Sequence, residues 1–312
     1  MYPRVEPFRT GRLARPDGAE LYWELSGNPH GRPALYLHGG PGGGLRRGGY
    51  RRRFDPEKYL IVGFDQRGCG RSTPWAMDDL DGLTGNTTQA QIADIEALRE
   101  VLGVDQWLMH GVSWGSTLAL AYALERPDRV SEIINVAVTT GSREEIDWLT
   151  EGVGRIFPEA WERFAAPAGD RRIVDVYAEM LRDPSSSVRR AAASAWDTWE
   201  STHISLDPEW MPGPLHHDPR DQQNFALLVS HYWSNDCFLT GSQRILDRAP
   251  ELAGIPGVLI HGRRDVSGPA GTAWELHRRW PGSSLHIAED EGHGGPKQMQ
   301  LVADTTDGFV QR

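Results

Sequence analysis

Cysteine is scarce in this chain, which contains only two among its 312 residues. Cys69 and Cys237 are too few to form the disulfide framework that holds many small secreted proteins together. Hydrophobic runs are also short, and none approaches the roughly 20 residues that a membrane-spanning helix needs. The segment from Met1 to Glu6 lacks the apolar stretch found in signal peptides. We therefore expect a cytoplasmic protein without a membrane segment.

An excess of positive charge is lacking, because the formal net charge at pH 7 is −10. A protein with this charge is a poor partner for nucleic acid or for an anionic membrane, and we expect neither as a ligand. One basic cluster does occur, and it consists of Arg46, Arg47, Arg51, Arg52 and Arg53. Because acidic residues (Asp55, Glu57) follow closely, we interpret the cluster as a solvated surface segment.

Motifs that bind metals or nucleotides are missing as well. The sequence has no H-E-x-x-H or C-x-x-C spacing and no G-x-x-x-x-G-K-[ST] phosphate loop. Its glycine-rich loop at residues 39–44 contains Pro41, which removes a backbone donor that a phosphate would need. We expect neither a metal ion nor another cofactor.

What the sequence does contain is an alternation of short apolar runs and helical patterns. An alternating segment at 20–26 reads as an antiparallel strand, and buried strands are expected at 34–38, 60–64, 108–110, 133–138, 257–261 and 284–288. From Thr88 to Leu102 the apolar residues fall on one helical stripe, and Asn86 and Thr87 supply capping residues before it. This order predicts an α/β fold, with a mainly parallel sheet covered by helices on both faces.

Between residues 141 and 245 the pattern changes, because strands give way to helices separated by proline and glycine. The expected helices span residues 144–156, 159–164, 172–182, 186–202 and 220–233. We expect two domains: residues 1–140 and 246–312 form a discontinuous core, and residues 141–245 form a helical cap over the sheet edge.

Ser113 stands at the centre of a G-x-S-x-G motif, Gly111-Val112-Ser113-Trp114-Gly115. An apolar run precedes the motif and a small-residue helical pattern follows it, which is the strand–turn–helix setting that a nucleophilic serine requires. The turn is so tight that side chains at Gly111 and Gly115 would clash. We predict that Ser113 is the nucleophile and that the N–H of Trp114 stabilises the oxyanion.

A nucleophilic serine needs a base that a third group orients. With this motif, the acid and then the histidine follow the serine in the chain. Asp265 comes just after the strand at 257–261, and His293 lies in a glycine-flanked loop after the last strand. We predict the triad Ser113, Asp265 and His293, with Asp290 and Glu291 as weaker candidates for the acid. The histidines that lie in or next to strands are expected to be structural: His38, His110, His261 and His286.

The second oxyanion donor is expected in the loop after the early strand 34–38. The loop sequence is His38-Gly39-Gly40-Pro41-Gly42, where glycines allow the backbone to approach the substrate closely. We predict the N–H of Gly40 as the donor, with Gly39 as the alternative, and expect His38 to shape the loop.

With these residues in place, the chain resembles the proline iminopeptidase (prolyl aminopeptidase) family of α/β-hydrolase serine peptidases. The resemblance covers nearly the whole chain, and its motifs are His38–Gly42, Asp65–Ser72, Asn86–Thr88, Ala93–Glu96, Ser113–Tyr122, Glu145–Trp148, Phe157–Glu159, Gly262–Asp265 and Thr272–His277. It implies an α/β-hydrolase fold with a helical cap. It also implies release of an amino-terminal residue, typically proline, from small peptides or amides.

The resemblance also implies one substrate-binding residue. The family holds the free ammonium of its substrate with acidic cap residues, one of which follows a tryptophan, and Trp199-Glu200 matches that pair. Without the resemblance, Glu200 would be read as a solvated carboxylate. Four positions depart from the family: Val229 replaces a second glutamate, Val112 replaces the usual glycine before the nucleophile, and Thr139 and Thr150 stand near common aromatic positions. One carboxylate fewer implies weaker ammonium binding.

We therefore predict a serine hydrolase that acts through an acyl-enzyme on small peptides or amides. Two alternatives stay open at this point. The same triad could cleave an ester or a non-peptide amide without a free amine. The fold could also bind a ligand without catalysing any reaction.

Overall fold

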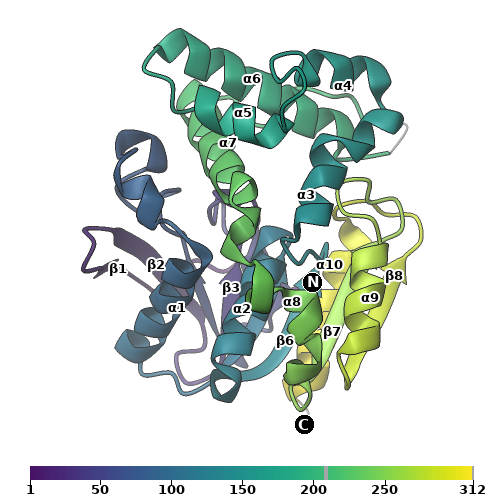
Figure 1. Cartoon of the computed structure of the whole chain (residues 1–312). Coiled ribbons are helices and arrows are strands. Elements are labelled where there is room, and N and C mark those ends of the chain that lie inside the picture. The colour runs from purple at the N-terminus through teal and green to yellow at the C-terminus, as the bar shows by residue number, and fades with distance from the viewer. Residues whose placement is uncertain (207–209, 311–312) are drawn as a thin grey trace.

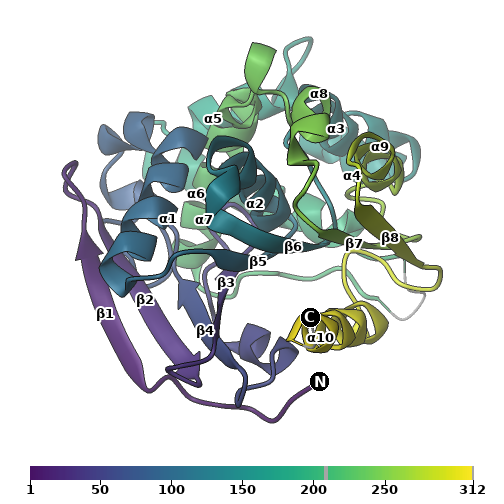
Figure 2. The ribbon, with the colours of Figure 1, turned by 90° about the horizontal axis from the view of Figure 1, so that it is seen from below.

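The computed structural model describes residues 1–206 and 210–310. Within them, one eight-stranded sheet has the order β1-β2-β4-β3-β5-β6-β7-β8 (Figures 1 and 2). β1 (Arg9–Ala14) and β2 (Glu20–Gly27) pair antiparallel, as do β2 and β4. The parallel strands are β3 (Arg32–Leu37), β4 (Tyr59–Phe64), β5 (Trp107–Val112), β6 (Val130–Val136), β7 (Gly257–Gly262) and β8 (Ser283–Ala288). The predicted strands and fold class are confirmed.

Helices cover both faces of the sheet (Figure 2). One face packs against α1 (Thr88–Leu102), α2 (Trp114–Glu125) and α9 (Gly271–Arg279), and the other against α10 (Pro296–Val310). Central strand β5 is apolar along its length for this reason: Trp107 and Met109 enter the cluster that contains α1 and α2 residues, while Leu108 enters the cluster that contains α10 residues. The predicted cap of α1 is also confirmed, because the Thr87 hydroxyl accepts from Ala90 N.

A group of helices stands above the carboxyl edge of the sheet (Figure 1). These helices are α3 (Arg143–Thr150), α4 (Pro158–Ala165), α5 (Ile173–Met180), α6 (Ser186–His203) and α7 (Pro219–Ser234). The chain returns to the core through α8 (Ile245–Arg248), which contacts α2. Among the described residues, no helix is both long enough and apolar enough to cross a membrane.

The expected single helix over residues 144–156 is wrong beyond Thr150. The structure ends α3 there and continues as a short 3-10 turn, Gly152–Arg155. Glycine is needed in that turn because aromatic rings pack on its backbone: a Cβ at Gly152 would lie 2.5 Å from the Trp148 ring, and one at Gly154 would lie 2.4 Å from the Trp161 ring. Tryptophan packing thus sets the end of the helix.

Candidate active site

A cavity of about 930 Å³ lies between the carboxyl edge of the sheet and the helices above it. Five of the six residues predicted for the site line this cavity, namely Gly40, Ser113, Trp114, Glu200 and His293. The sixth, Asp265, is buried behind His293. Segments that are far apart in the sequence therefore meet at one place, as the strand order predicts.

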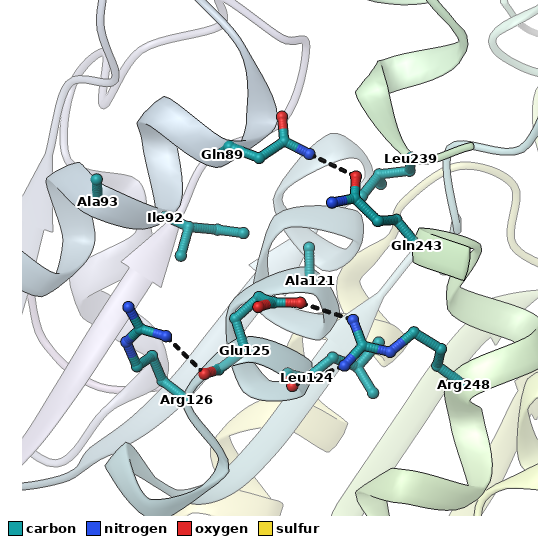
Figure 3. A pocket seen from close by; sticks show the side chains of 10 residues that line it. All are labelled: Gln89, Ile92, Ala93, Ala121, Leu124, Glu125, Arg126, Leu239, Gln243 and Arg248. Atoms are coloured by element: carbon teal, nitrogen blue, oxygen red, sulfur yellow. Dashed lines mark hydrogen bonds and ion pairs between the residues drawn. The ribbon is translucent and has the colours of Figure 1, made fainter. Parts of the chain in front are cut away.

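A second and smaller hollow, of about 200 Å³, lies between α1, α2 and the segment before α8 (Figure 3). Its polar side chains bind one another: Gln89 Nε2 donates to Gln243 Oε1 at 2.7 Å, and Arg248 pairs with Glu125 at 2.6 Å. None of the predicted site residues lines it. The larger cavity is the candidate active site.

Ser113 occupies the tight turn between β5 and α2 with φ 55° and ψ −125°, a backbone conformation that L-residues rarely adopt. Its N–H donates to Val136 O at 2.9 Å, which ties the turn to strand β6. A Cβ at Gly111 would lie 2.3 Å from Gly115 O, and one at Gly115 would lie 2.1 Å from Leu37 O. The steric reason predicted for both glycines is therefore confirmed.

The change Gly115→Ala is expected to lower the free energy of unfolding by about 2–4 kcal/mol, because the new methyl group overlaps the Leu37 carbonyl and the turn must shift. Activity falls as well, since the shift displaces Ser113. Urea unfolding measures the decrease in the free energy of unfolding. Gly308→Ala is the matched control, because nothing lies within 4 Å of its Cβ position in α10, and it should be neutral or stabilising. Equal stability of the two variants would contradict the steric argument.

His293 and Asp265 form a hydrogen-bonded pair. Nδ1 of His293 lies 2.8 Å from Oδ2 of Asp265, whose other carboxylate oxygen accepts from Gly268 N at 2.9 Å. Burial alone would raise the pKa of Asp265, but the charge and hydrogen bond of His293 bring it below its ordinary value. Burial likewise opposes the charge on His293, but Asp265 and then Glu200 raise its pKa. The pair can therefore hold a proton on the imidazole.

Ser113 and His293 line the same cavity. Among residues 1–206 and 210–310, no hydrogen bond joins the Ser113 hydroxyl to the His293 ring. Catalytic hydrogen bonds are often long in an unoccupied site and tighten when substrate binds. The arrangement is thus compatible with a nucleophile and its base.

The two weaker candidates for the acid have other partners. Asp290 is exposed and pairs with the ammonium of Lys297. Glu291 is buried, and its carboxylate accepts from Lys297 N at 2.7 Å and Gln298 N at 2.8 Å, which caps the start of α10. Only Asp265, of the three, contacts the imidazole.

His38 shapes the glycine-rich loop, as expected. Gln66 N donates to its Nε2 at 3.1 Å, and its Nδ1 lies 3.0 Å from Gly39 O and 3.2 Å from Gly44 N. Gly43 N donates to the same carbonyl at 3.0 Å. In a trans peptide the N–H points away from the carbonyl, so the N–H of Gly40 is turned away from these partners. Among the described residues, Gly40 N–H donates to no protein acceptor.

The loop also lies directly against the nucleophile. A Cβ at Gly39 would lie 3.2 Å from Cβ of Ser113 and 3.8 Å from its Oγ. Trp114 begins helix α2, where the first N–H groups have no partner within the helix. The backbone N–H groups of Gly40 and Trp114 are therefore available beside Ser113 to bind an oxyanion.

Glu200 projects from α6 into the cavity. Oε1 accepts from Trp196 Nε1 at 2.7 Å, and no cation pairs with this carboxylate within the described residues. Burial raises the pKa of Glu200 to about 7, although Trp196 and the nearby His216 oppose the rise. A half-buried carboxylate without a cation is suited to receive a positively charged group from a ligand.

The departures from the family pattern lie in distinct surroundings. Val229 is fully buried in α7, and Thr150 is buried outside the cavity lining. Thr139 lines the cavity, where its hydroxyl donates to Ser113 O at 3.0 Å. Aromatic rings come instead from Phe225 and Trp233 of α7, two lining residues that no pattern beyond helical spacing indicates in the sequence.

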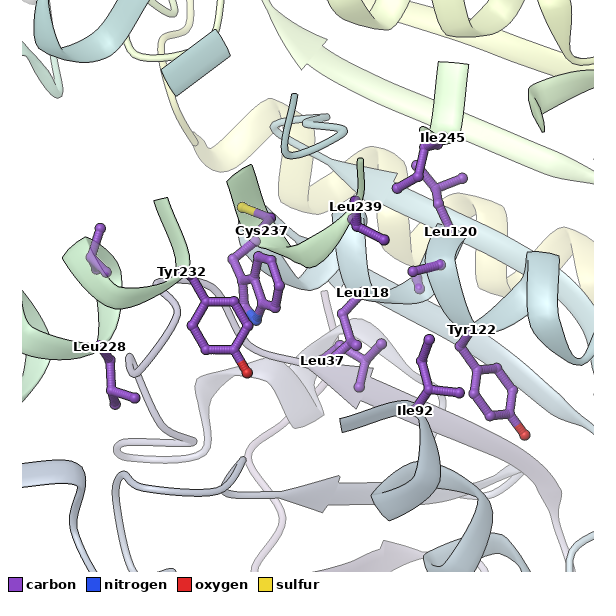
Figure 4. Packing of buried hydrophobic residues seen from close by; sticks show 14 of the residues in the cluster. Leu37, Ile92, Leu118, Leu120, Tyr122, Leu228, Tyr232, Cys237, Leu239 and Ile245 are labelled. Carbon is purple, nitrogen blue, oxygen red and sulfur yellow. The ribbon is translucent and has the colours of Figure 1, made fainter. Parts of the chain in front are cut away.

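Helix α7 packs on the core through Leu228 and Tyr232, two members of the buried hydrophobic cluster (Figure 4). The Tyr232 ring packs edge-on against Trp114 with centroids 4.7 Å apart, and its hydroxyl donates to Asn86 Oδ1 at 2.7 Å. Leu228 covers the glycine-rich loop so closely that a Cβ at Gly42 would lie 2.9 Å from its Cδ1. These contacts therefore fix the position of α7 relative to Trp114 and the glycine-rich loop.

Comparisons with known proteins agree with this geometry. The profile of the alpha/beta hydrolase fold family matches residues 33–296. A probable proline iminopeptidase of Streptomyces coelicolor is 44% identical, over 100% of this chain and 98% of its own. The proline iminopeptidase of Xylella fastidiosa (strain Temecula1) is 41% identical over 99% of both chains. Among solved structures, a proline iminopeptidase of Mycobacterium smegmatis superimposes with a TM-score of 0.64 at 18% identity, covering 97% of this chain and 99% of its own.

Proposed function

Because the chain belongs to the proline iminopeptidase family of α/β hydrolases, we propose that it releases amino-terminal residues, typically proline, from small peptides. The observation that carries the proposal is the hydrogen bond from His293 to Asp265 at the edge of a cavity that also holds Ser113 and Glu200. Those side chains supply a nucleophile, a base, an orienting acid and an anchor for an amino group.

In the proposed reaction, the Ser113 hydroxyl attacks the carbonyl carbon of the amino-terminal residue. His293 takes the hydroxyl proton and then gives it to the leaving amine, while Asp265 fixes the ring and stabilises its positive charge. The N–H groups of Gly40 and Trp114 bind the oxyanion of the tetrahedral intermediate. Water, deprotonated by His293, then hydrolyses the acyl-enzyme and restores Ser113.

We also propose that residues 141–245 form the cap domain and that residues 1–140 and 246–312 form the core. The position of α3 to α7 above the sheet edge supports this division (Figure 1). The cap supplies Glu200, and the core supplies the triad and the oxyanion loop.

The change Glu200→Gln is expected to lower kcat/KM for a proline arylamide about 10- to 100-fold, because a charge-assisted hydrogen bond to the substrate ammonium contributes about 1.5–3 kcal/mol. In the wild type, a carboxyl group with a pKa of about 7 is protonated below that pH. Ammonium binding therefore strengthens as pH rises through 7. In the variant this contribution to the acid limb is lost, and only the contribution of His293 is left. Steady-state kinetics between pH 5 and 9 measure both effects.

Glu162→Gln is the matched control, since Glu162 is an exposed residue of the cap helix α4 outside the cavity lining, and its kinetics should equal those of the wild type. An N-acylated proline arylamide separates the proposal from the alternative without a free amine. If the wild type preferred the acylated compound, or if Glu200→Gln left KM and the pH profile unchanged, the ammonium role would be wrong.

A further inference from the structure

The arginines between residues 46 and 53 do not form one solvated segment, and the sequence interpretation is wrong in this respect. Arg51 is buried and pairs with Glu24 at 2.6 Å, and Arg52 Nε donates to Tyr2 O at 3.1 Å outside the cavity. The remaining three arginines line the active-site cavity: Arg46, Arg47 and Arg53. We call these three the cavity arginines.

Arg53 is held by neutral groups. It is half-buried, its NH1 lies 2.7 Å from Nε2 of His110, and its guanidinium lies 5.3 Å from the centroid of the Tyr36 ring. Burial, and then the charge of Arg53, lower the pKa of His110 to about 3, so this imidazole is neutral and accepts from Arg53. Its Nδ1 faces Ile134 O at 3.0 Å, which fixes the ring from the other side.

The cavity arginines have no carboxylate in direct contact among the described residues. Within residues 1–206 and 210–310, no Asp or Glu oxygen lies within ion-pair distance of any of the three. Arg46 donates to Gly43 O at 3.1 Å and lies 3.4 Å from Nε2 of His216, whose Nδ1 is 2.8 Å from Oδ1 of Asp197. A guanidinium that has lost part of its water and found no anion in the protein retains donors for an anionic ligand.

Among the described residues, the acidic lining of the same cavity consists of Glu145 and Glu200. Glu145 is already bound, since its carboxylate accepts from Thr140 N, Thr140 Oγ1 and Ser142 N. Glu200 comes from cap helix α6, whereas the cavity arginines come from the core loop after β3. Within the part of the chain that the structure describes, the cavity therefore offers one carboxylate without a cation, from the cap, and three arginines without an anion, from the core.

We propose that Arg53, with Arg46 and Arg47, binds a carboxylate on the leaving-group side of the scissile bond, so that the enzyme prefers short peptides with a free carboxyl terminus. This inference rests on the proposed function, because Glu200 then takes the amino end of the substrate and Ser113 the first carbonyl. Only the leaving peptide is left to reach the cavity arginines, and in a di- or tripeptide its end carries a carboxylate. An acidic side chain in the leaving peptide offers the same chemistry.

The test compares kcat/KM for Pro-Gly-Gly with kcat/KM for its carboxyl-terminal amide. Hydrolysis of a proline arylamide measures the basal aminopeptidase activity. The wild type is expected to favour the free acid about tenfold or more. In Arg53→Gln the ratio of acid to amide falls toward one, and Arg53→Lys retains part of it because the charge remains. Pro-Glu-amide against Pro-Gln-amide shows whether a side-chain carboxylate is the source.

Arg189→Gln is the matched control, since Arg189 is half-buried, binds backbone carbonyls and lies outside the cavity, and it should leave the ratio unchanged. If Arg53→Gln fails to fold, the double variant Arg46→Gln/Arg47→Gln, at two exposed positions, should lower the ratio of acid to amide in the same way. Equal rates for acid and amide in the wild type would overturn the carboxylate site. Failure of the wild type to cleave the arylamide would instead overturn the proposed function, so the two failures are distinguishable.

Discussion

Ser113→Ala is expected to lower kcat by roughly 10⁴- to 10⁶-fold, because the acyl-enzyme cannot form without the hydroxyl. The fold should be retained, since the hydroxyl makes no hydrogen bond within the described residues and alanine adopts the same backbone as readily as serine. The measurements are steady-state hydrolysis of a proline arylamide, thermal unfolding, and labelling with a fluorophosphonate probe. The wild type takes up the probe and the variant does not.

Ser131→Ala is the matched control for this variant. Ser131 lies near the start of β6, at the end of the strand away from the cavity, and its hydroxyl donates to Trp107 O at 3.0 Å. It should be labelled and active at wild-type levels. Full activity or full labelling of Ser113→Ala would remove the nucleophile assignment and with it the acyl-enzyme. Failure of the wild type to take up the probe would instead revive a ligand-binding role without catalysis.

Asp265→Asn is the second change with a large expected effect, a loss of about 10⁴-fold in kcat, because the amide no longer holds the imidazole in the productive tautomer. The pH profile carries a further signature. Asp265 raises the pKa of His293, and the base must be unprotonated, so wild-type activity falls as pH drops through that raised pKa. Without the carboxylate the pKa of His293 falls, and the acid limb of kcat/KM moves to lower pH.

The two other carboxyl groups near His293 in sequence serve as controls for Asp265→Asn. Asp290→Asn removes an exposed ion pair with Lys297 and should leave both rate and pH profile unchanged. Glu291→Gln replaces one of the two carboxylate acceptors at the start of α10 with an amide NH2 group that cannot accept, so it should lower the free energy of unfolding by about 1–3 kcal/mol and keep the acid limb in place. A displaced limb in either variant would assign the acid elsewhere.

Much of the core could be predicted from the sequence because its signals are local. Thr87 caps α1, and β5 is apolar on both faces since it is buried on both. The turn at Ser113 is specified by two glycines whose absent side chains make room for Leu37 and Gly115 carbonyls. Strand β1 escaped prediction because Leu13 is its single buried residue, and one residue makes no pattern.

Site residues could be predicted where the order of strands along the chain determines their positions. They could not be predicted where their positions depend on packing between distant segments. Asp265 and His293 follow neighbouring strands β7 and β8, so their loops must meet. The role of Arg53 depends on contacts with His110 and Tyr36, residues of two other strands whose proximity no local pattern reveals. The role of Glu200 could be predicted only from the resemblance to the family, because a glutamate in a helix has the same local sequence pattern whether it is solvated or faces a cavity.

The contacts of Tyr232 and Leu228 have a mechanical consequence. Tyr232 packs on Trp114 and Leu228 packs on the glycine-rich loop, so α7 cannot move away from the core without losing these contacts beside the nucleophile. We therefore expect substrates to enter and leave without movement of α7. A cavity that does not open in this way would favour short peptides over the interior of long polypeptides.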